Sequence, residues 1–231
     1  IDNWSVSKIK RMGADAVKVL AWYRPDAGKR VLEAQQQHVQ KIGDECAKHD
    51  ILFLFELLVY PLSKDLYQTK EYVEMQNKKT DHVLESVREF SNKKYGVDVF
   101  KLESPVNVNK IADSDLNAFK EMGNIAGRPW VMLSAGAGKE EFKNVLKLAF
   151  KAGCSGFLAG RAIWLDAFMH YPNWDKIQNQ LESNAKDYLD EIGEMADKSA
   201  LSWNNHVCYD KDGSDFPYDN QEFRLHYNEI E

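Results

Sequence analysis

Three apolar runs that carry ionisable residues constrain the fold of this chain. They span residues 16–20, 52–58 and 97–103. Such runs are typical of strands that are buried on both faces, as in a parallel sheet. Helical patterns separate them at residues 27–48 and 81–94, and strands that are joined through helices pair in parallel. The sequence therefore predicts an α/β fold built on a parallel sheet.

A doubly wound sheet and a (β/α)8 TIM barrel both fit this alternation, which continues with strand patterns at residues 129–134 and 155–159. The barrel is favoured because polar residues follow nearly every strand, where barrel enzymes build their sites. Only about five strands are apparent, against eight in a barrel. We therefore expect the N-terminal strands to be missing from this chain, with residues 1–200 forming the C-terminal portion of one barrel.

A segment at residues 201–231 follows the last helical pattern and is rich in aromatic residues, Asn and Asp. It has no clear period, so we interpret it as a C-terminal extension that covers the barrel or a neighbouring subunit. A homo-oligomer is one of the assemblies that this interpretation leaves open. A long helix over residues 175–200 is expected to precede it.

The composition is that of a globular protein with one sizeable core, since the chain has 231 residues, 44% of them hydrophobic. Its net charge of −6 argues against nucleic acid or an anionic membrane surface as the main partner. No apolar run approaches the ~20 residues that span a bilayer. The three cysteines form no C-x-x-C pair, so we expect free thiols and a cytoplasmic location.

The ionisable residues inside the apolar runs indicate chemistry at one site. Lys18, Glu56 and Lys101 occupy similar depths on three strands, and a buried lone charge is costly unless it is paired or functional. A lysine nucleophile, a second cation and a carboxylate that moves protons would together suit amine chemistry. The alternatives are a lysine that snorkels to solvent and a structural Lys18–Glu56 ion pair. Glu103 is a lesser candidate that would pair with a lysine.

Two small-residue turns predict an anion site. Ser134, Ala135 and Gly136 end one strand pattern, and Gly160 and Arg161 end the next. In barrels the last two such loops form the usual phosphate site, where backbone N–H groups and a helix N-terminus face the anion. Two ordinary turns are the alternative, but the arginine favours phosphate.

Neither a nucleotide loop nor a metal site is predicted. The stretch 136–139 (GAGK) lacks the first glycine and the Ser/Thr of a Walker A loop. His206, Cys208 and His226 have spacings that match no standard zinc signature. We therefore expect no metal and no cofactor.

The chain resembles the tagatose 1,6-bisphosphate aldolase family, which comprises LacD-type, metal-independent class I aldolases with a (β/α)8 fold. Two segments are also similar to the related sulfofructose-phosphate aldolases, at 22–26 (WYRPD) and 155–162 (SGFLAGRA). The family's Asp-Gln-Arg-Gly motif is absent from this sequence. The resemblance to the first family rests on 13–18 (GADAVK), 42–46 (IGDEC), 55–58 (FELL), 97–107 (VDVFKLESPVN), 133–136 (LSAG) and 160–164 (GRAIW).

The resemblance implies a role for each matched residue. Lys101 would form a Schiff base with the substrate ketone, Glu56 would shuttle protons, and Lys18 would sit beside them. The phosphate of the dihydroxyacetone phosphate half would bind at the two turns described above.

Three functions follow as expectations. The leading one is cleavage of a ketose 1,6-bisphosphate, of the tagatose or fructose type, to dihydroxyacetone phosphate and glyceraldehyde 3-phosphate. The second is cleavage of 6-deoxy-6-sulfofructose 1-phosphate, with Tyr23, Arg24 or Tyr60 binding the anion at C6. The third is a non-catalytic sugar-phosphate-binding protein.

Overall fold

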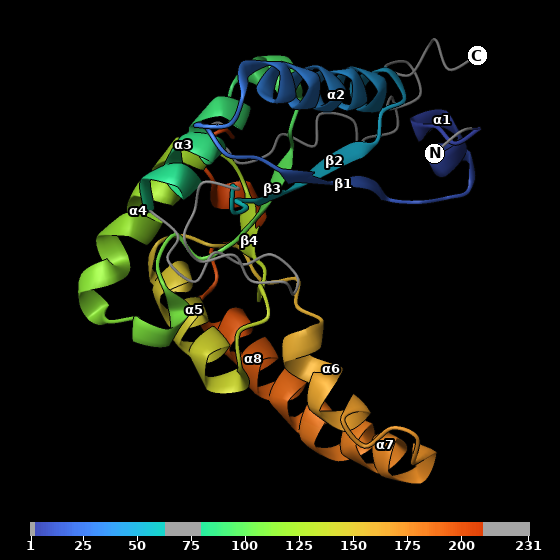
Figure 1. Cartoon of the computed structure of the whole chain (residues 1–231), viewed down its shortest axis with the longest axis vertical. Helices are drawn as coiled ribbons and strands as arrows, with labels where there is room; N and C mark the ends of the chain where they lie inside the picture. The colour runs from blue at the N-terminus through green and yellow to red at the C-terminus, as the bar shows by residue number, and fades with distance from the viewer. Residues whose placement is uncertain (1–2, 63–79, 210–231) are drawn as a thin grey trace, which may run out of the picture.

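The structure, a computed structural model, describes residues 3–62 and 80–209 and contains one parallel sheet (Figure 1). Its strands follow the chain in the order β1-β2-β3-β4, and each pairs in parallel with the next. Their bounds are β1 Ala16–Trp22, β2 Leu52–Leu58, β3 Val99–Leu102 and β4 Trp130–Met132. The predicted parallel α/β fold is confirmed.

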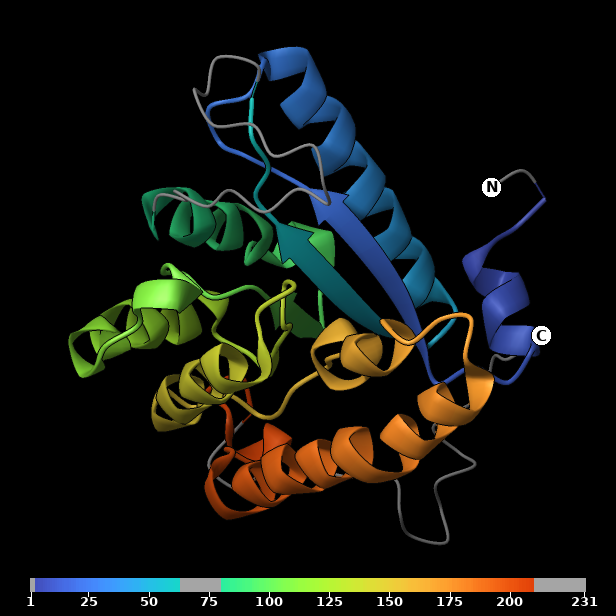
Figure 2. The same cartoon turned by 60° about the horizontal axis from the view of Figure 1, so that its bottom comes forward.

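The connecting helices lie along one side of the sheet, and Figure 2 shows α2 running beside β1 and β2. A short helix, α1 Val6–Arg11, precedes β1. The connecting helices are α2 Lys29–Lys48, α3 Thr80–Phe90, α4 Leu116–Ala126 and α5 Lys139–Lys151, with 3₁₀ turns η1 Lys93–Tyr95, η2 Val108–Lys110 and η3 Asp113–Asp115.

Three further helices follow the last sheet residues (Figure 1). They are α6 Arg161–Phe168, α7 Trp174–Gln180 and α8 Lys186–Ser199, and a 3₁₀ turn, η5 Trp203–Asn205, comes after them. The long helix predicted over residues 175–200 is confirmed, because residues 174–199 are helical without a break, and a π-helical turn, η4 Leu181–Ala185, lies between α7 and α8. No helix among the described residues is both long and apolar enough to cross a membrane.

The face of the sheet toward the helices forms the centre of the core. Phe53, Phe55 and Phe100 project from it and are fully buried. The ring of Phe90 on α3 lies 4.8 Å from that of Phe55 and 4.7 Å from that of Tyr23. Burial of such rings contributes most of the stabilisation that a sheet–helix layer provides.

The opposite face is less buried, so the prediction of strands buried on both faces holds for residues 55–58 of β2 but not for β1, β3 or the start of β2. Lys18 is exposed and Leu52 is 41% exposed on this face, whereas their sequence neighbours Val17 and Phe53 are buried. The difference arises because helices cover the first face, while no described strand or helix covers the second in the same way. The second face is therefore available to a functional site.

The predicted strand at residues 155–159 forms only one bridge, between Met132 and Phe157. Residues 201–209 begin the predicted extension and lie beside it, because Leu201 donates to the carbonyl of Cys154 and Ser155 contacts the His206 ring 2.7 Å away. Burial lowers the pKa of His206. Residues 210–231, including His226, lie outside the described residues.

All three cysteines lie in the described residues and carry free thiols, as the sequence predicted. Cys46 and Cys154 are buried, and Cys208 is exposed. Burial raises the pKa of Cys154 to about 12, so this thiol stays protonated near neutral pH.

Candidate active site

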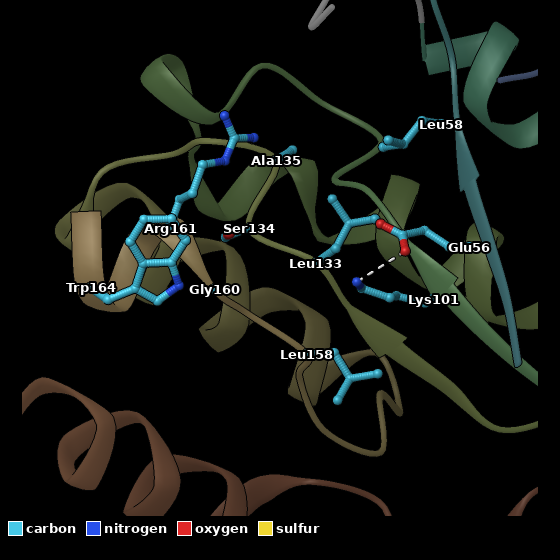
Figure 3. A pocket seen from close by; sticks show the side chains of 10 residues that line it. All are labelled: Glu56, Leu58, Lys101, Leu133, Ser134, Ala135, Leu158, Gly160, Arg161 and Trp164. Carbon is cyan, nitrogen blue, oxygen red and sulfur yellow. Dashed lines mark ion pairs between the residues drawn. The ribbon is translucent and has the colours of Figure 1, made fainter. Parts of the chain in front are cut away.

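The three ionisable residues predicted to converge do so on the open face of the sheet. The carboxylate of Glu56 lies 2.9 Å from Nζ of Lys18 and 3.1 Å from Nζ of Lys101, and both lysines contact the same oxygen, Oε2. Figure 3 shows the Glu56–Lys101 ion pair inside the pocket. The one carboxylate contacts both lysines, so Lys101, the less exposed of the two, is not left without a partner.

Strand register explains this convergence. Glu56 on β2 stands opposite Lys101 on β3, and neighbouring positions on adjacent parallel strands point to the same face. Lys18 stands opposite Leu54, two residues before Glu56, and reaches it with its long side chain. Lys101 is the less accessible lysine, with a side chain 17% exposed against 48% for Lys18.

The first predicted anion loop has an unusual backbone. Ala135 and Gly136 adopt φ angles of 48° and 76°, in the left-handed region. Non-glycine residues occupy this region uncommonly, and such strain concentrates at functional sites. Among the described residues, neither of their amide N–H groups has a hydrogen-bond acceptor. Amides that turn together in this way suit an anion.

The second predicted anion loop opens helix α6. Gly160 is the N-cap of α6, and Arg161 is its first residue. The N–H groups of a first helical turn and the helix dipole attract an anion, and a guanidinium adds bidentate charge. A Cβ on Gly160 would lie 3.3 Å from Nε1 of Trp164, so the glycine permits close approach of the indole.

One cavity of about 450 Å³ joins the ion pair to both loops. Four of its residues were not predicted as site residues: Leu58, Leu133, Leu158 and Trp164. Trp164 had a sequence signal, because it follows Arg161 by three positions and so lies on the same helix face. Lys18 and Gly136 adjoin the cavity without lining it. The full lining is Glu56, Leu58, Lys101, Leu133, Ser134, Ala135, Leu158, Gly160, Arg161 and Trp164 (Figure 3).

The residues suggested for an anion at C6 lie away from this cavity. Arg24 is 2% exposed and makes two contacts with the carboxylate of Asp26, through Nε at 2.7 Å and Nη2 at 3.2 Å. Its Nη1 also donates to the carbonyl of Tyr60. The ring of Tyr23 packs on Phe90 in the helix-side core. These contacts tie the loops after β1 and β2 together.

Glu103 is 3% exposed. Its Oε1 accepts a hydrogen bond from the backbone N–H of Val59 at 2.7 Å. The carboxylate thus bridges the residues that follow β3 and β2. In the described part of the chain, no three His, Cys, Asp or Glu side chains gather as metal ligands would.

Comparison with known proteins identifies the family. The family model described as DeoC/LacD family aldolase matches residues 1–166. Tagatose 1,6-diphosphate aldolase 1 of Enterococcus faecalis is 33% identical over 216 residues, which cover 87% of this chain and 66% of that protein. The Lactococcus lactis tagatose 1,6-diphosphate aldolase is 30% identical over 222 residues, covering 90% and 67%. The chain thus spans about two thirds of the length of these relatives.

Solved structures agree on the fold. A Schiff-base-forming fructose-1,6-bisphosphate aldolase superposes with a TM-score of 0.56 at 18% identity, over 85% of this chain and 64% of that one. An archaeal fructose-1,6-bisphosphate aldolase, captured as a carbinolamine on its catalytic lysine, gives 0.54 at 18% identity over 84% and 62%. The parallel sheet is accordingly part of a (β/α)8 barrel, and the chain belongs to the DeoC/LacD aldolase family.

Proposed function

We propose that this chain carries the site of a class I aldolase, which cleaves a ketose 1,6-bisphosphate of the tagatose or fructose type. The products are dihydroxyacetone phosphate and glyceraldehyde 3-phosphate. The observation that carries the proposal is the Glu56 carboxylate held 3.1 Å from the Lys101 amine in a cavity with two anion loops. The names of the curated relatives support the substrate class.

Lys101 is the proposed nucleophile. Its neutral amine attacks the C2 ketone, and the carbinolamine that forms loses water to give a protonated imine. Glu56 takes the proton that Lys101 gives up in becoming neutral and later supplies it to the departing hydroxyl, because its carboxyl group lies within hydrogen-bond reach of the same nitrogen. Lys101 is favoured over Lys18 because it lines the cavity and is less exposed.

Cleavage then uses the imine as the electron sink. Glu56 removes the proton from the C4 hydroxyl, and the C3–C4 bond breaks. Its electron pair forms a C2=C3 double bond while the C2=N π electrons move onto the nitrogen, which gives an enamine. The aldehyde leaves, the enamine takes up a proton at C3, and water releases dihydroxyacetone phosphate from Lys101. Lys18 acts as an electrostatic partner that orients the Glu56 carboxylate.

Ser134, Ala135, Gly136, Gly160 and Arg161 are the proposed binding residues for the phosphate on C1. The left-handed loop and the start of α6 border the same cavity as Lys101. A phosphate held there would place C2 close to the nucleophile, and such positioning is a large part of catalysis. The engagement of Arg24 with Asp26 gives no support to a C6 sulfonate site at that residue.

Borohydride reduction in the presence of dihydroxyacetone phosphate tests the proposal. The imine should be trapped as a stable adduct on Lys101, located by peptide mass spectrometry. EDTA treatment should change neither the formation of this adduct nor the turnover of tagatose 1,6-bisphosphate. Phosphate binding without any adduct would indicate the non-catalytic sugar-phosphate-binding protein. An adduct on Lys18 alone would overturn the assignment of the nucleophile.

A further inference from the structure

Two carboxylates that flank β3 each accept a hydrogen bond from the backbone of the β2 segment, one at each end of the β2–β3 pairing. At the beginning, Oδ2 of Asp98 accepts a hydrogen bond from the N–H of Phe53 at 2.7 Å. At the end, Oε1 of Glu103 accepts one from the N–H of Val59, also at 2.7 Å. Glu103 is buried, whereas Asp98 is exposed.

The bond at Glu103 extends the ladder beyond its last main-chain pair. The register of β2 with β3 ends at Leu57 opposite Leu102, and the chain bends at Pro105. Val59 is 2% exposed, so water does not readily serve its N–H, and a buried N–H without an acceptor is costly. The Glu103 side chain supplies the acceptor that a longer β3 would have given.

This hydrogen bond matters because it lies next to the proposed catalytic pair, Glu56 and Lys101. Glu56 lies three residues before Val59, and Lys101 lies two residues before Glu103. The bond therefore joins the two strands immediately after the residues whose side chains must meet at 3.1 Å. A small displacement of β2 relative to β3 would separate the Glu56 oxygen from the Lys101 nitrogen. A misplacement of about 1 Å can lower the rate of catalysis about 10²-fold.

We propose that Glu103 is a positioning residue, which holds the end of β2 against β3 so that Glu56 stays within proton-transfer distance of Lys101. This inference rests on the proposed function. It predicts that the acceptor oxygen of Glu103 is what matters. A neutral side chain of the same shape that keeps the oxygen should therefore serve almost as well.

The test compares three substitutions at Glu103 with one at the other end of the ladder. Glu103→Gln keeps the acceptor, Glu103→Leu removes it, Glu103→Asp keeps the charge but shortens the reach, and Asp98→Leu is the matched control. With tagatose 1,6-bisphosphate, Glu103→Leu and Glu103→Asp should lower kcat about 10- to 100-fold, with little change in KM. Glu103→Gln and Asp98→Leu should keep kcat within about twofold, since neither disturbs the catalytic end of the ladder.

A second measurement follows the bond itself. Hydrogen exchange of the Val59 amide should accelerate in Glu103→Leu and Glu103→Asp but not in Glu103→Gln. If Glu103→Leu does not fold, Glu103→Asp decides. The inference is overturned if both variants keep wild-type kcat, if Glu103→Gln loses as much as Glu103→Leu, or if Asp98→Leu loses as much. Failure of the proposed function gives a different result, namely no borohydride adduct on Lys101 in the unaltered protein.

Discussion

Phe100 and Lys101 are neighbours in the chain, yet they belong to opposite faces of the sheet and to different tasks. Phe100 is fully buried and faces the α3 side, 6.3 Å from the ring of Phe55. Lys101 points into the cavity of the other face, against Glu56. One face gathers rings that stabilise the fold, and the other gathers charges that cost stability. Stability and chemistry are therefore separable by substitution, one residue apart.

The sharpest test of this separation replaces each of the two neighbours, Lys101 and Phe100, in a separate variant. Lys101→Met should abolish turnover and the borohydride adduct, because no amine remains to form the imine. Its unfolding free energy should fall little, since Glu56 keeps Lys18 as its partner. Phe100→Ala should instead cost about 3–5 kcal/mol of stability. Steady-state kinetics and urea unfolding of both variants measure the two effects, and a Lys101→Met protein with residual turnover would contradict the assignment.

Glu56→Gln tests the carboxylate on the chemical face. The amide keeps the size of the side chain but cannot exchange protons in the same way, so turnover should slow about 10²- to 10⁴-fold. Dihydroxyacetone phosphate should still form some adduct on Lys101, more slowly. Rapid-quench kinetics separate imine formation from cleavage. Turnover near the wild-type rate would assign the proton shuttle to a group other than Glu56.

Arg161→Ala tests the anion loops on the same face. Loss of a charge-assisted contact of about 1.5–3 kcal/mol should weaken binding of dihydroxyacetone phosphate about 10- to 150-fold. Calorimetric titration measures this loss, and Arg161→Lys should recover part of the affinity while losing the bidentate geometry. An unchanged affinity would remove Arg161 from the phosphate site.

The sequence predicted the site better than it predicted the surroundings of the site. Apolar runs predict the strands and put Glu56 and Lys101 at similar depths along them, and the register seen in the structure then places the two residues opposite each other. The role of Trp164 was missed although its spacing from Arg161 was a signal, because α6 begins at Arg161 after Gly160, without a Ser, Thr or Asp cap to mark the helix start. The π-helical turn between α7 and α8 has no signal in the helical pattern of the sequence. Burial of both sheet faces was overestimated because patterns report hydrophobicity and not what covers it.

The helix side of the sheet also contains a close contact at one glycine. Gly43 lies on α2 where this helix touches η1, and a Cβ there would sit 2.0 Å from the carbonyl oxygen of Tyr95. Gly193 on α8 is also a glycine within a helix, but a Cβ there would have no neighbour within 4 Å. The two positions share a backbone conformation and differ in the space around them.

Alanine at these two glycines should therefore change stability in opposite directions. Gly193→Ala should stabilise the protein by about 0.5–1 kcal/mol, because alanine loses less backbone entropy in a helix. Gly43→Ala has the same entropic advantage, but the contact of its Cβ with Tyr95 forces α2 and η1 apart, which lowers stability by about 1–3 kcal/mol. Urea midpoints measure both, and kcat should stay unchanged since neither helix face borders the cavity. Stabilisation by Gly43→Ala would show that α2 and η1 separate easily, and the helix-side layer would then be less tightly packed than its buried rings indicate.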